Sequence, residues 1–402
     1  MLNRIVPLLL LFSLCLAAPG AGEGASRKML PVSRSTAEAM LGQMLMFGFR
    51  GTGPDDPDHA GDFQAMLDFV KQGKAGGVVL FYTDYATRKP GRNISGPEQL
   101  KAMNAALQAA ASSSPAAAAL KGESLPLLIG VDQEGGRVRR LFPAQGFMDL
   151  PAPSAMGVMQ ESAVHNYGLR LGEELHSLGV NLNFAPSLDL NLNPGNPVIG
   201  SLGRSFGNTP ELVIRKAGAF GVGLTEAGVA ACFKHFPGHG SSSGDSHLAF
   251  TDISKTWKRE ELQPYLVLLN NPAFPKEASY LVMPGHLFNS AHDDKYPASL
   301  SAKTVNGLLR GKIGWQGVVV SDDLQMKAVS DHYSLEETIL LSMEAGVDIL
   351  LFGNNLDYDP ELPEKVWQAA RRLLHEKKIR PERVAESYER IIRLKKWLVE
   401  RQ

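Results

Sequence analysis

The chain has 402 residues, of which 44% are hydrophobic and 21% are charged. This composition is typical of a globular protein with a substantial core and excludes a disordered chain. The 41 basic and 42 acidic residues give a formal net charge of −1. No basic field therefore exists to collect nucleic acid, and a small or neutral partner is expected.

The first 21 residues have the layout of a secretory signal peptide. A single basic residue precedes an apolar run over 5–18, and small residues follow it. The run is too short for a comfortable membrane span. We therefore expect cleavage near Gly20 or Ala21, a periplasmic or secreted location, and no stable membrane insertion after cleavage. An uncleaved anchor is the alternative.

Between residues 33 and 400 one pattern recurs: a short apolar run, a turn bearing glycine or aspartate, and a helical pattern. The apolar runs are 43–49, 76–82, 125–132, 179–186, 229–235, 279–286, 317–323 and 347–353. Because they are nearly continuous and rich in Val, Ile and Leu, they are typical of parallel strands buried on both faces. Helical patterns between and after them cover 97–111, 161–178, 209–227, 301–311, 334–345 and 381–402.

Eight strands with intervening helices predict an α/β protein, a (β/α)8 TIM barrel that forms a single catalytic domain over residues 33–400. A doubly wound open sheet is the alternative fold. Its dinucleotide-binding form is disfavoured because no Gly-x-Gly-x-x-Gly pattern follows the first strand. Two further stretches, 111–124 and 270–279, read as loops with little structure.

Polar side chains occur where the predicted strands end. They are Asp132, Lys234, His235, His286, Asp322 and Asp323. TIM barrels keep their active sites at the C-terminal ends of the strands. A single polar residue there can merely cap a neighbouring helix, but residues on several strands together indicate a functional site. Asp323 is expected to point away from that site, because neighbouring strand residues face opposite sides.

The stretch "KHFPGHGSSSGDSH" at 234–247 suggests two kinds of chemistry, of which the first is a metal site. The candidate ligands are His235, His239, Asp245, His247 and His286. Barrel metallohydrolases usually carry a His-x-His pair on the first strand, whereas here that strand ends in "FGFRG". The loop spacing also fixes no ligand face, so a metal-dependent hydrolase is the less favoured alternative.

The second kind of chemistry is glycoside hydrolysis, which needs a group that attacks the anomeric carbon and one that protonates the leaving oxygen. Asp322 would be the nucleophile, since a carboxylate on a rigid strand end is well placed to attack. His247 would be the proton donor, with Asp245 orienting its ring. Glu134 competes for the acid role, but its place in "DQEGGR" suits hydrogen bonding within the turn.

Five motifs resemble, in order, those of the β-N-acetylglucosaminidases of glycoside hydrolase family 3. They are "GVDQEGGRVRRL", "NFAPSLDL", "GRSFG", "KHFPGHGSSSGDSH" and "VVSDDLQM", and the likeness spans roughly residues 38–355. "KHFPGHG" followed by "DSH" marks the branch with a histidine acid/base. Many relatives instead take a glutamate from a second domain.

The resemblance implies a role for each matching residue. Asp322 resembles the nucleophile, His247 the acid/base and Asp245 its partner, while Asp132 resembles the residue that grips the outer hydroxyls of the sugar. The other substrate-binding residues would be Arg140, Arg204, Lys234 and His235. No metal or organic cofactor is implied.

The implied reaction is retaining hydrolysis, in which an exported exo-enzyme releases terminal N-acetylglucosamine from peptidoglycan-derived or chitin-derived saccharides through a glycosyl-enzyme. Phosphate in place of water as the acceptor is a related possibility. A non-catalytic barrel that binds amino sugars, as a sensor or scaffold, is the alternative of a different class.

The stretch departs from the family pattern after "GHG". The family often has an acidic or amide residue and then threonine there, whereas this chain has Ser241 and Ser242. The eight-residue step from His239 to His247 is kept. The departure therefore bears on the resting conformation of the loop more than on its chemistry.

Overall fold

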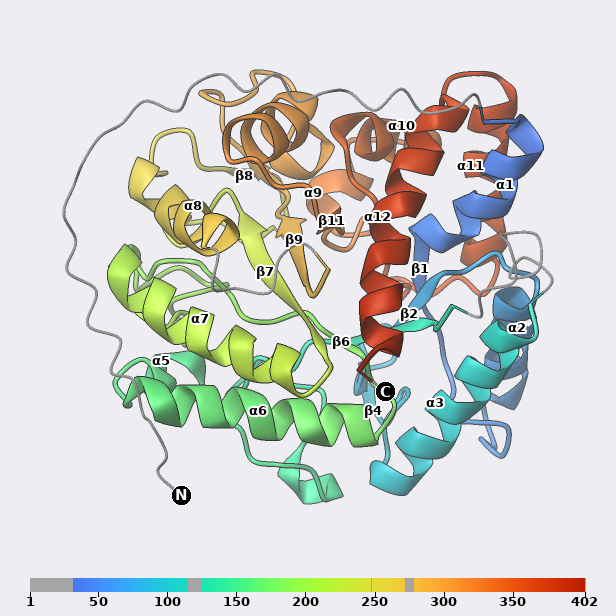
Figure 1. The fold of residues 1–402 in the computed structure, drawn as a ribbon, viewed down its shortest axis with the longest axis horizontal. Coiled ribbons are helices and arrows are strands. Elements are labelled where there is room, and N and C mark those ends of the chain that lie inside the picture. Colours follow the sequence, from blue (N-terminus) through green and yellow to red (C-terminus); the bar gives the residue numbers. More distant parts are fainter. Residues whose placement is uncertain (1–31, 115–124, 247, 272–277, 402) are drawn as a thin grey trace, which may run out of the picture. The chain divides into compact units, whose positions relative to one another are not determined.

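Eight parallel strands pair in chain order in one curved sheet (Figure 1). The computed structural model describes residues 32–114, 125–246, 248–271 and 278–401. The strands are β1 (Leu45–Gly48), β2 (Gly77–Leu80), β5 (Leu128–Val131), β6 (Leu182–Asn183), β7 (Ala230–Phe236), β9 (Tyr280–Pro284), β11 (Val318–Val319) and β12 (Leu350–Phe352). Each lies within one of the predicted apolar runs or extends it by one residue.

The two edge strands of this sheet meet. Val320 and Ile349, next to β11 and β12, form a parallel bridge, and the Ser321 N–H donates to the Ile349 carbonyl at 2.9 Å. The strand order and this junction confirm the predicted TIM-barrel fold and contradict the open doubly wound sheet. Every residue of the eight strands is buried, as expected for a parallel sheet covered on both faces.

Helices follow the strands along the chain, as the helical patterns predict. The α-helices are α1 (Arg34–Leu41), α2 (Ala60–Lys71), α3 (Pro97–Ser112), α5 (Pro153–Met156), α6 (Glu161–Ser177), α7 (Pro210–Glu226), α8 (Gln263–Asn270), α9 (Lys327–Ser330), α10 (Leu335–Ala345), α11 (Leu362–His375) and α12 (Pro381–Val399). Tighter or wider turns are η1 (Gly42–Met44), η2 (Pro143–Gln145), η3 (Arg259–Leu262), η4 (Ala298–Leu300) and the π-helix η5 (Lys303–Lys312). The helical patterns predicted from the sequence do not include α1, α2, α5, α8, α9 and α11.

Local chemistry sets several helix ends. Ser334 and Glu337 form a capping box at the start of α10, with the Ser334 N–H 2.9 Å from Glu337 Oε2. Gly346 ends the same helix with a left-handed φ of 104°, which glycine adopts without a steric penalty. Thr209 caps α7 and Pro210 occupies its first turn.

The glycines of α6 and α7 let these two helices pack closely, side by side in Figure 1. A Cβ on Gly168 would lie 2.2 Å from the Phe220 carbonyl oxygen, and one on Gly223 would lie 2.3 Å from that of His165. Both distances are too short for any side chain, so larger residues would separate the helices that position β6 and β7.

The N-terminal face of the barrel holds buried charged side chains with a structural role. Asp348, just before β12, is fully buried and binds Arg310 at 2.6 Å, Arg390 at 3.0 Å and Ser387 at 2.6 Å. These contacts join η5 and α12 to the sheet. Polar residues on this face of a TIM barrel serve stability rather than catalysis.

Four short strands form two additional pairs that the sequence reading did not predict. β3 (Thr83–Asp84) pairs with β4 (Lys89–Pro90), and β8 (Thr251–Asp252) pairs with β10 (Leu287–Phe288). Both pairs belong to loops that follow the carboxyl ends of the barrel strands. Segments of two residues carry no periodicity that a sequence pattern would reveal.

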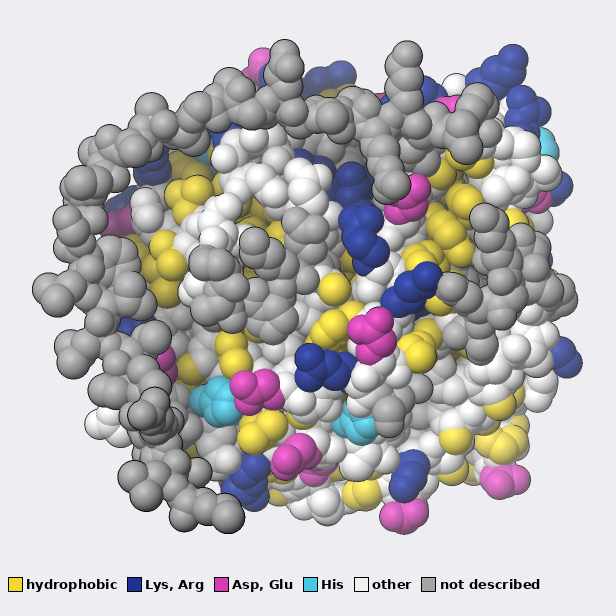
Figure 2. Space-filling model, in the orientation of Figure 1, with side chains coloured by type: hydrophobic (Ala, Val, Ile, Leu, Met, Phe, Trp, Pro, Cys, Tyr) yellow, Lys and Arg dark blue, Asp and Glu magenta, His cyan; other side chains and the backbone are white. Residues whose placement is uncertain are grey.

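The face drawn in Figure 2 carries acidic, basic and apolar side chains interspersed, in keeping with the balanced charge of the chain. Among the described residues, no helix is both long and apolar enough to cross a membrane. The predicted signal peptide at 1–21 and His247 lie outside the described residues, as do parts of the predicted loops at 111–124 and 270–279.

Candidate active site

Three of the predicted substrate-binding residues meet at the carboxyl ends of β5 and β7. The Lys234 Nζ lies 2.7 Å from Asp132 Oδ1, and Arg140 Nη2 lies 3.0 Å from Asp132 Oδ2. Burial alone would raise the pKa of Asp132, but the charges of Lys234 and Arg140 outweigh it and hold the pKa below its usual value. Asp132 is therefore an ionised hydrogen-bond acceptor that remains partly exposed.

Glu134 and Arg204 form a buried bidentate ion pair beside these residues. Arg204 Nε and Nη2 donate to the two carboxylate oxygens at 2.9 Å and 2.7 Å, and Lys234 Nζ lies 2.8 Å from Oε1. Burial raises the pKa of Glu134, but Arg204 and Lys234 lower it to about 2. Glu134 is therefore ionised and unsuited to donate a proton. Its side chain bonds across the site rather than within its own turn, which corrects the sequence reading.

His235 is held between Arg204 and an aspartate that the sequence reading did not single out. His235 Nδ1 lies 2.6 Å from Asp189 Oδ2, and its Nε2 lies 3.2 Å from Arg204 Nη2. An aspartate accepts and a guanidinium only donates, so Nδ1 carries the proton and Nε2 accepts. Asp189 is buried, as are His235 and Arg204, so Arg204 acts on the site by supporting its neighbours.

An irregularity in β7 brings consecutive side chains into one network. The pairing of β7 with β9 shifts register between Lys234 and Phe236. In a regular strand, neighbours point to opposite faces. Here Lys234 and His235 both contact the same cluster, through Glu134 and Arg204.

Asp322 and Asp323 follow β11 and differ in their surroundings. Asp323 Oδ1 accepts hydrogen bonds from the N–H groups of Gly353 at 2.9 Å and Gln325 at 3.1 Å, so its carboxylate ties two loops together. Asp322 is partly exposed and accepts the Asp323 N–H at 2.9 Å. Asp323 therefore has a structural role in the turn after β11.

Two observations relate Asp322 to the rest of the site. Burial raises the pKa of the Cys232 thiol, Lys234 partly opposes this, and the charges of Asp132 and Asp322 add to it. Asp132 follows β5 and Asp322 follows β11, so both carboxylates belong to the carboxyl ends of the barrel strands. His286, after β9, bonds to the Asp323 carbonyl through Nε2 at 2.9 Å and to Ser299 Oγ through Nδ1 at 2.6 Å. Since a carbonyl only accepts, Nε2 carries the proton and fixes the turn that follows Asp322.

The stretch after β7 is bound to the loop that follows β6. The His239 N–H donates to Asp189 Oδ1 at 2.7 Å, and burial lowers the pKa of His239 to about 4, so its ring is neutral. Asp245 is partly exposed, and its carbonyl accepts the N–H groups of Leu248 and Ala249 at 3.1 Å. His247, the predicted acid/base, is not among the described residues, and the structure leaves its predicted role untested.

Those candidate metal ligands that lie among the described residues do not converge on one point. Within residues 32–114, 125–246, 248–271 and 278–401, no group of three or more His, Cys, Asp or Glu side chains has the geometry of a metal site. His235 and His286 each use both ring nitrogens in hydrogen bonds to protein atoms.

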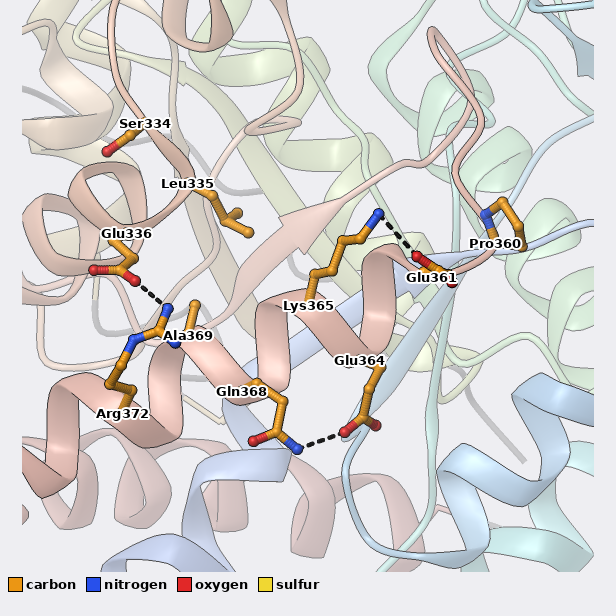
Figure 3. Close-up of a pocket in the computed structure, with 10 residues that line it drawn as sticks. All are labelled: Ser334, Leu335, Glu336, Pro360, Glu361, Glu364, Lys365, Gln368, Ala369 and Arg372. Carbon is orange, nitrogen blue, oxygen red and sulfur yellow. Dashed lines mark hydrogen bonds and ion pairs between the residues drawn. The ribbon is translucent and has the colours of Figure 1, made fainter.

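A groove of about 820 Å³ lies apart from these residues, against α10 and α11 (Figure 3). Its charged side chains satisfy one another: Arg372 pairs with Glu336, and Lys365 pairs with Glu361 at 3.2 Å. Figure 3 shows Gln368 turned toward Glu364, which it contacts at 2.6 Å. None of the predicted site residues lines this groove.

Comparisons with known proteins cover nearly the whole barrel. Residues 36–394 match the family described as "Glycosyl hydrolase family 3 N terminal domain". A beta-hexosaminidase of Neisseria meningitidis serogroup B is 37% identical over 301 residues, which are 72% of this chain and 74% of that protein. Beta-hexosaminidase A of Pseudoalteromonas piscicida is 30% identical over 393 residues, which are 90% of this chain and 61% of that protein.

Comparisons with solved structures indicate the same family. A glycoside hydrolase family 3 beta-N-acetylglucosaminidase from Paenibacillus sp. has a TM-score of 0.76 and 34% identity over 90% of this chain, which spans only 62% of that one. A beta-N-acetylhexosaminidase from Beutenbergia cavernae has a TM-score of 0.75 and 28% identity, over 90% of this chain and 98% of that chain. The chain therefore belongs to glycoside hydrolase family 3 and is a glycoside hydrolase with a TIM-barrel fold.

Proposed function

We propose that the protein is a retaining exo-β-N-acetylglucosaminidase that removes terminal N-acetylglucosamine from saccharides. The observation that carries the proposal is the cluster of Asp132, Lys234 and Arg140 at the strand ends, on the same face as Asp322. A carboxylate that two cations keep ionised is suited to accept hydrogen bonds from sugar hydroxyls. The names of the beta-hexosaminidase relatives support the amino-sugar specificity.

In the proposed first step, a carboxylate oxygen of Asp322 attacks the anomeric carbon while His247 gives its proton to the departing glycosidic oxygen. The glycosidic bond breaks, and a glycosyl ester on Asp322 forms. Asp245 would orient the imidazole and favour its protonated form.

In the second step, the now neutral His247 takes a proton from water, the resulting hydroxide oxygen bonds to the anomeric carbon, and Asp322 leaves as a carboxylate. A neutral histidine does not repel an ionised nucleophile as a second carboxylate would. The ordinary pKa of histidine, about 6.5, lets one side chain serve as acid and then as base near neutral pH.

We further propose that the enzyme is exported and that its substrates are fragments of peptidoglycan, with chitin oligosaccharides as the second choice. The signal-like N-terminus supports export. An exported enzyme of this specificity would meet cell-wall fragments outside the cytoplasm, which supports peptidoglycan fragments as its substrates. Comparing turnover of muropeptides and chitin oligosaccharides of equal length tests the substrate preference.

The stereochemistry of the first product tests the reaction class. Proton NMR during hydrolysis of an aryl N-acetyl-β-glucosaminide should show β-N-acetylglucosamine first, and the α anomer should appear only by slow mutarotation. Initial release of the α anomer would contradict a glycosyl-enzyme. Binding of N-acetylglucosamine without any hydrolysis would instead favour the non-catalytic sugar-binding barrel.

A further inference from the structure

A buried carboxylate from another element holds the stretch that leads from β7 to Asp245. Glu261 belongs to η3 and is fully buried. Its Oε2 accepts the N–H groups of Gly240 at 2.9 Å and Ser241 at 3.3 Å, and its Oε1 accepts the Ser241 hydroxyl at 2.6 Å. We infer that Glu261 is a positioning residue for the proton donor: it fixes the base of the loop that carries Asp245 and His247. The inference rests on the function proposed above.

The loop base, defined as residues 237–242, is tied down on more than one side. The Trp257 indole N–H donates to the Pro237 carbonyl at 3.1 Å. From the loop after β6, Asn196 donates to the His239 carbonyl at 2.7 Å, and Asn193 donates to that of Ser242 at 2.9 Å. These bonds and those of Glu261 fix the backbone path of the base.

The loop tip, defined as residues 243–246 and 248–250, is more exposed than the base except at Ser246, which is buried. Ser243 is exposed, and Leu248 and Phe250 have exposed fractions of 68% and 42%. Asp245 lies in the tip, three residues beyond the end of the base. The base sets the direction in which the chain enters the tip, and Glu261 helps to fix that direction.

The close approach of the loop base to Glu261 requires glycine. Gly238 has a φ of 124°, and a Cβ there would lie 2.5 Å from the Glu261 Cβ. A Cβ on Gly240 would lie 1.6 Å from the Leu190 carbonyl oxygen. Both glycines let the chain pass between Glu261 and the loop after β6, which brings the Gly240 N–H against the carboxylate.

Ser241 makes the contact with Glu261 favourable in this chain. Its hydroxyl donates to Oε1, whereas an acidic side chain at position 241 would place a second carboxylate against Glu261. The contact thus gives a physical meaning to one departure from the family pattern. Burial raises the pKa of Glu261 to about 7, while the hydrogen bond from Ser241 opposes this rise and the charge of Asp189 adds to it. The ionised form of Glu261 therefore depends on the hydrogen bonds that it accepts.

The experiment compares substrates that differ in their need for a proton. Hydrolysis of N,N′-diacetylchitobiose needs acid assistance, whereas 2,4-dinitrophenol is stable as an anion and leaves without it. A misplaced general acid loses part of its roughly 10²–10⁴-fold contribution. We expect Glu261→Ala to lower kcat/KM for the disaccharide by about 10-fold to 100-fold, and for the dinitrophenyl glycoside by less than about threefold.

Three companion variants complete the design. Glu260→Ala, on the exposed side of the same turn, should leave both substrates unchanged. Glu261→Gln keeps an oxygen for the two N–H groups and an amide that can donate to the Ser241 hydroxyl, so it should recover most of the disaccharide activity. Ser241→Ala removes a single donor and should lower only the disaccharide rate, by a smaller factor.

A parallel fall on both substrates in Glu261→Ala would overturn the inference, because loss of folded enzyme affects every substrate equally. If that variant does not fold, Ser241→Ala decides: a selective loss on the disaccharide supports the inference, and an unchanged ratio overturns it. His247→Ala is the reference. If the His247→Ala variant loses activity equally on both substrates, the proposed acid role of His247 fails, independently of the result for Glu261→Ala.

Discussion

Arg204 and Glu134 face each other through two parallel hydrogen bonds, of 2.9 Å and 2.7 Å, in the buried floor of the candidate site. Both side chains are almost inaccessible to solvent, at 7% and 1% exposure. The pair therefore supports the more exposed residues Asp132 and Arg140, and Lys234 connects it to them.

This arrangement predicts a large loss of stability when either partner is removed. Arg204→Met leaves the Glu134 carboxylate buried with only Lys234 to neutralise it, and should lower the free energy of unfolding by about 3–5 kcal/mol. Urea denaturation measures the change. The double variant with Glu134→Gln should cost less than the sum of the single variants.

The control for this pair is Arg139→Met. Arg139 pairs at 3.1 Å with Asp149, whose side chain is 79% exposed, so its loss should cost less than about 1 kcal/mol. Equal effects of the Arg139 and Arg204 variants would contradict the distinction between a solvated pair and a buried one.

The position of Asp132 between two cations predicts that its replacement weakens substrate binding. In Asp132→Asn the ionised acceptor between Lys234 and Arg140 becomes a neutral amide, so hydrogen bonds to the sugar hydroxyls weaken. We expect kcat/KM to fall at least about 100-fold, which corresponds to roughly 3 kcal/mol of charged hydrogen bonding. Steady-state kinetics and calorimetric binding of N-acetylglucosamine should both register the loss. Full binding affinity in this variant would remove Asp132 from the substrate site.

The pH profile tests the proposed acid/base. With a carboxylate nucleophile and a histidine acid, kcat/KM on a poor leaving group should follow a bell with limbs between about pH 5 and 8. His247→Ala should lower the maximum by about 10²–10⁴-fold and remove the alkaline limb, because that limb reports loss of the histidine proton. An unaltered bell in His247→Ala would assign the proton to another residue.

The burial of Lys395 predicts that the free energy of unfolding depends on pH, independently of catalysis. Its Nζ is buried against neutral acceptors, 2.6 Å from Gln43 Oε1 and 2.9 Å from the Gly76 carbonyl, and burial lowers its pKa to about 7. The unfolded chain keeps the usual value near 10.4. Between pH 7 and 9 the unfolded state therefore binds more protons, and stability rises with pH by about 2 kcal/mol from this group.

Lys395→Met should lack this rise, while Lys396→Met, at the exposed neighbouring position, should keep it. Urea denaturation at pH 7, 8 and 9 measures the three slopes. Parallel slopes for the wild type and Lys395→Met would show that this amine keeps its charge in the folded protein.

The strands of the barrel were predictable because each is a continuous apolar run, and the TIM-barrel fold followed from their number and spacing. Every barrel strand except β7 is shorter than the apolar run that predicts it, and β6 and β11 have only two residues each. At β6 the side chain of Asn183 replaces ladder bonds, accepting from the Gln133 N–H and donating to the Gln133 carbonyl, both at 3.0 Å. Side chains that substitute for backbone pairing leave no periodic trace in the sequence.

The predicted binding residues were found through their positions at strand ends and the resemblance to a family, and the structure brings Asp132, Arg140, Arg204, Lys234 and His235 into one network. Asp189 and Glu261 were not predicted. Asp189 stands within "NFAPSLDL", but its contact with His235 joins residues far apart in the chain. Glu261 sits in an ordinary charged helical stretch, and only the fold shows that it faces glycines.

The central claim, a metal-free glycosidase with Asp322 as nucleophile, is tested most directly by one comparison. Hydrolysis of an aryl N-acetyl-β-glucosaminide is measured in excess chelator for the wild type, Asp322→Asn and the exposed control Asp331→Asn. We predict full activity in the wild type and the control, and a loss of at least about 10³-fold in Asp322→Asn. Activity abolished by the chelator, or retained in Asp322→Asn, would contradict the claim.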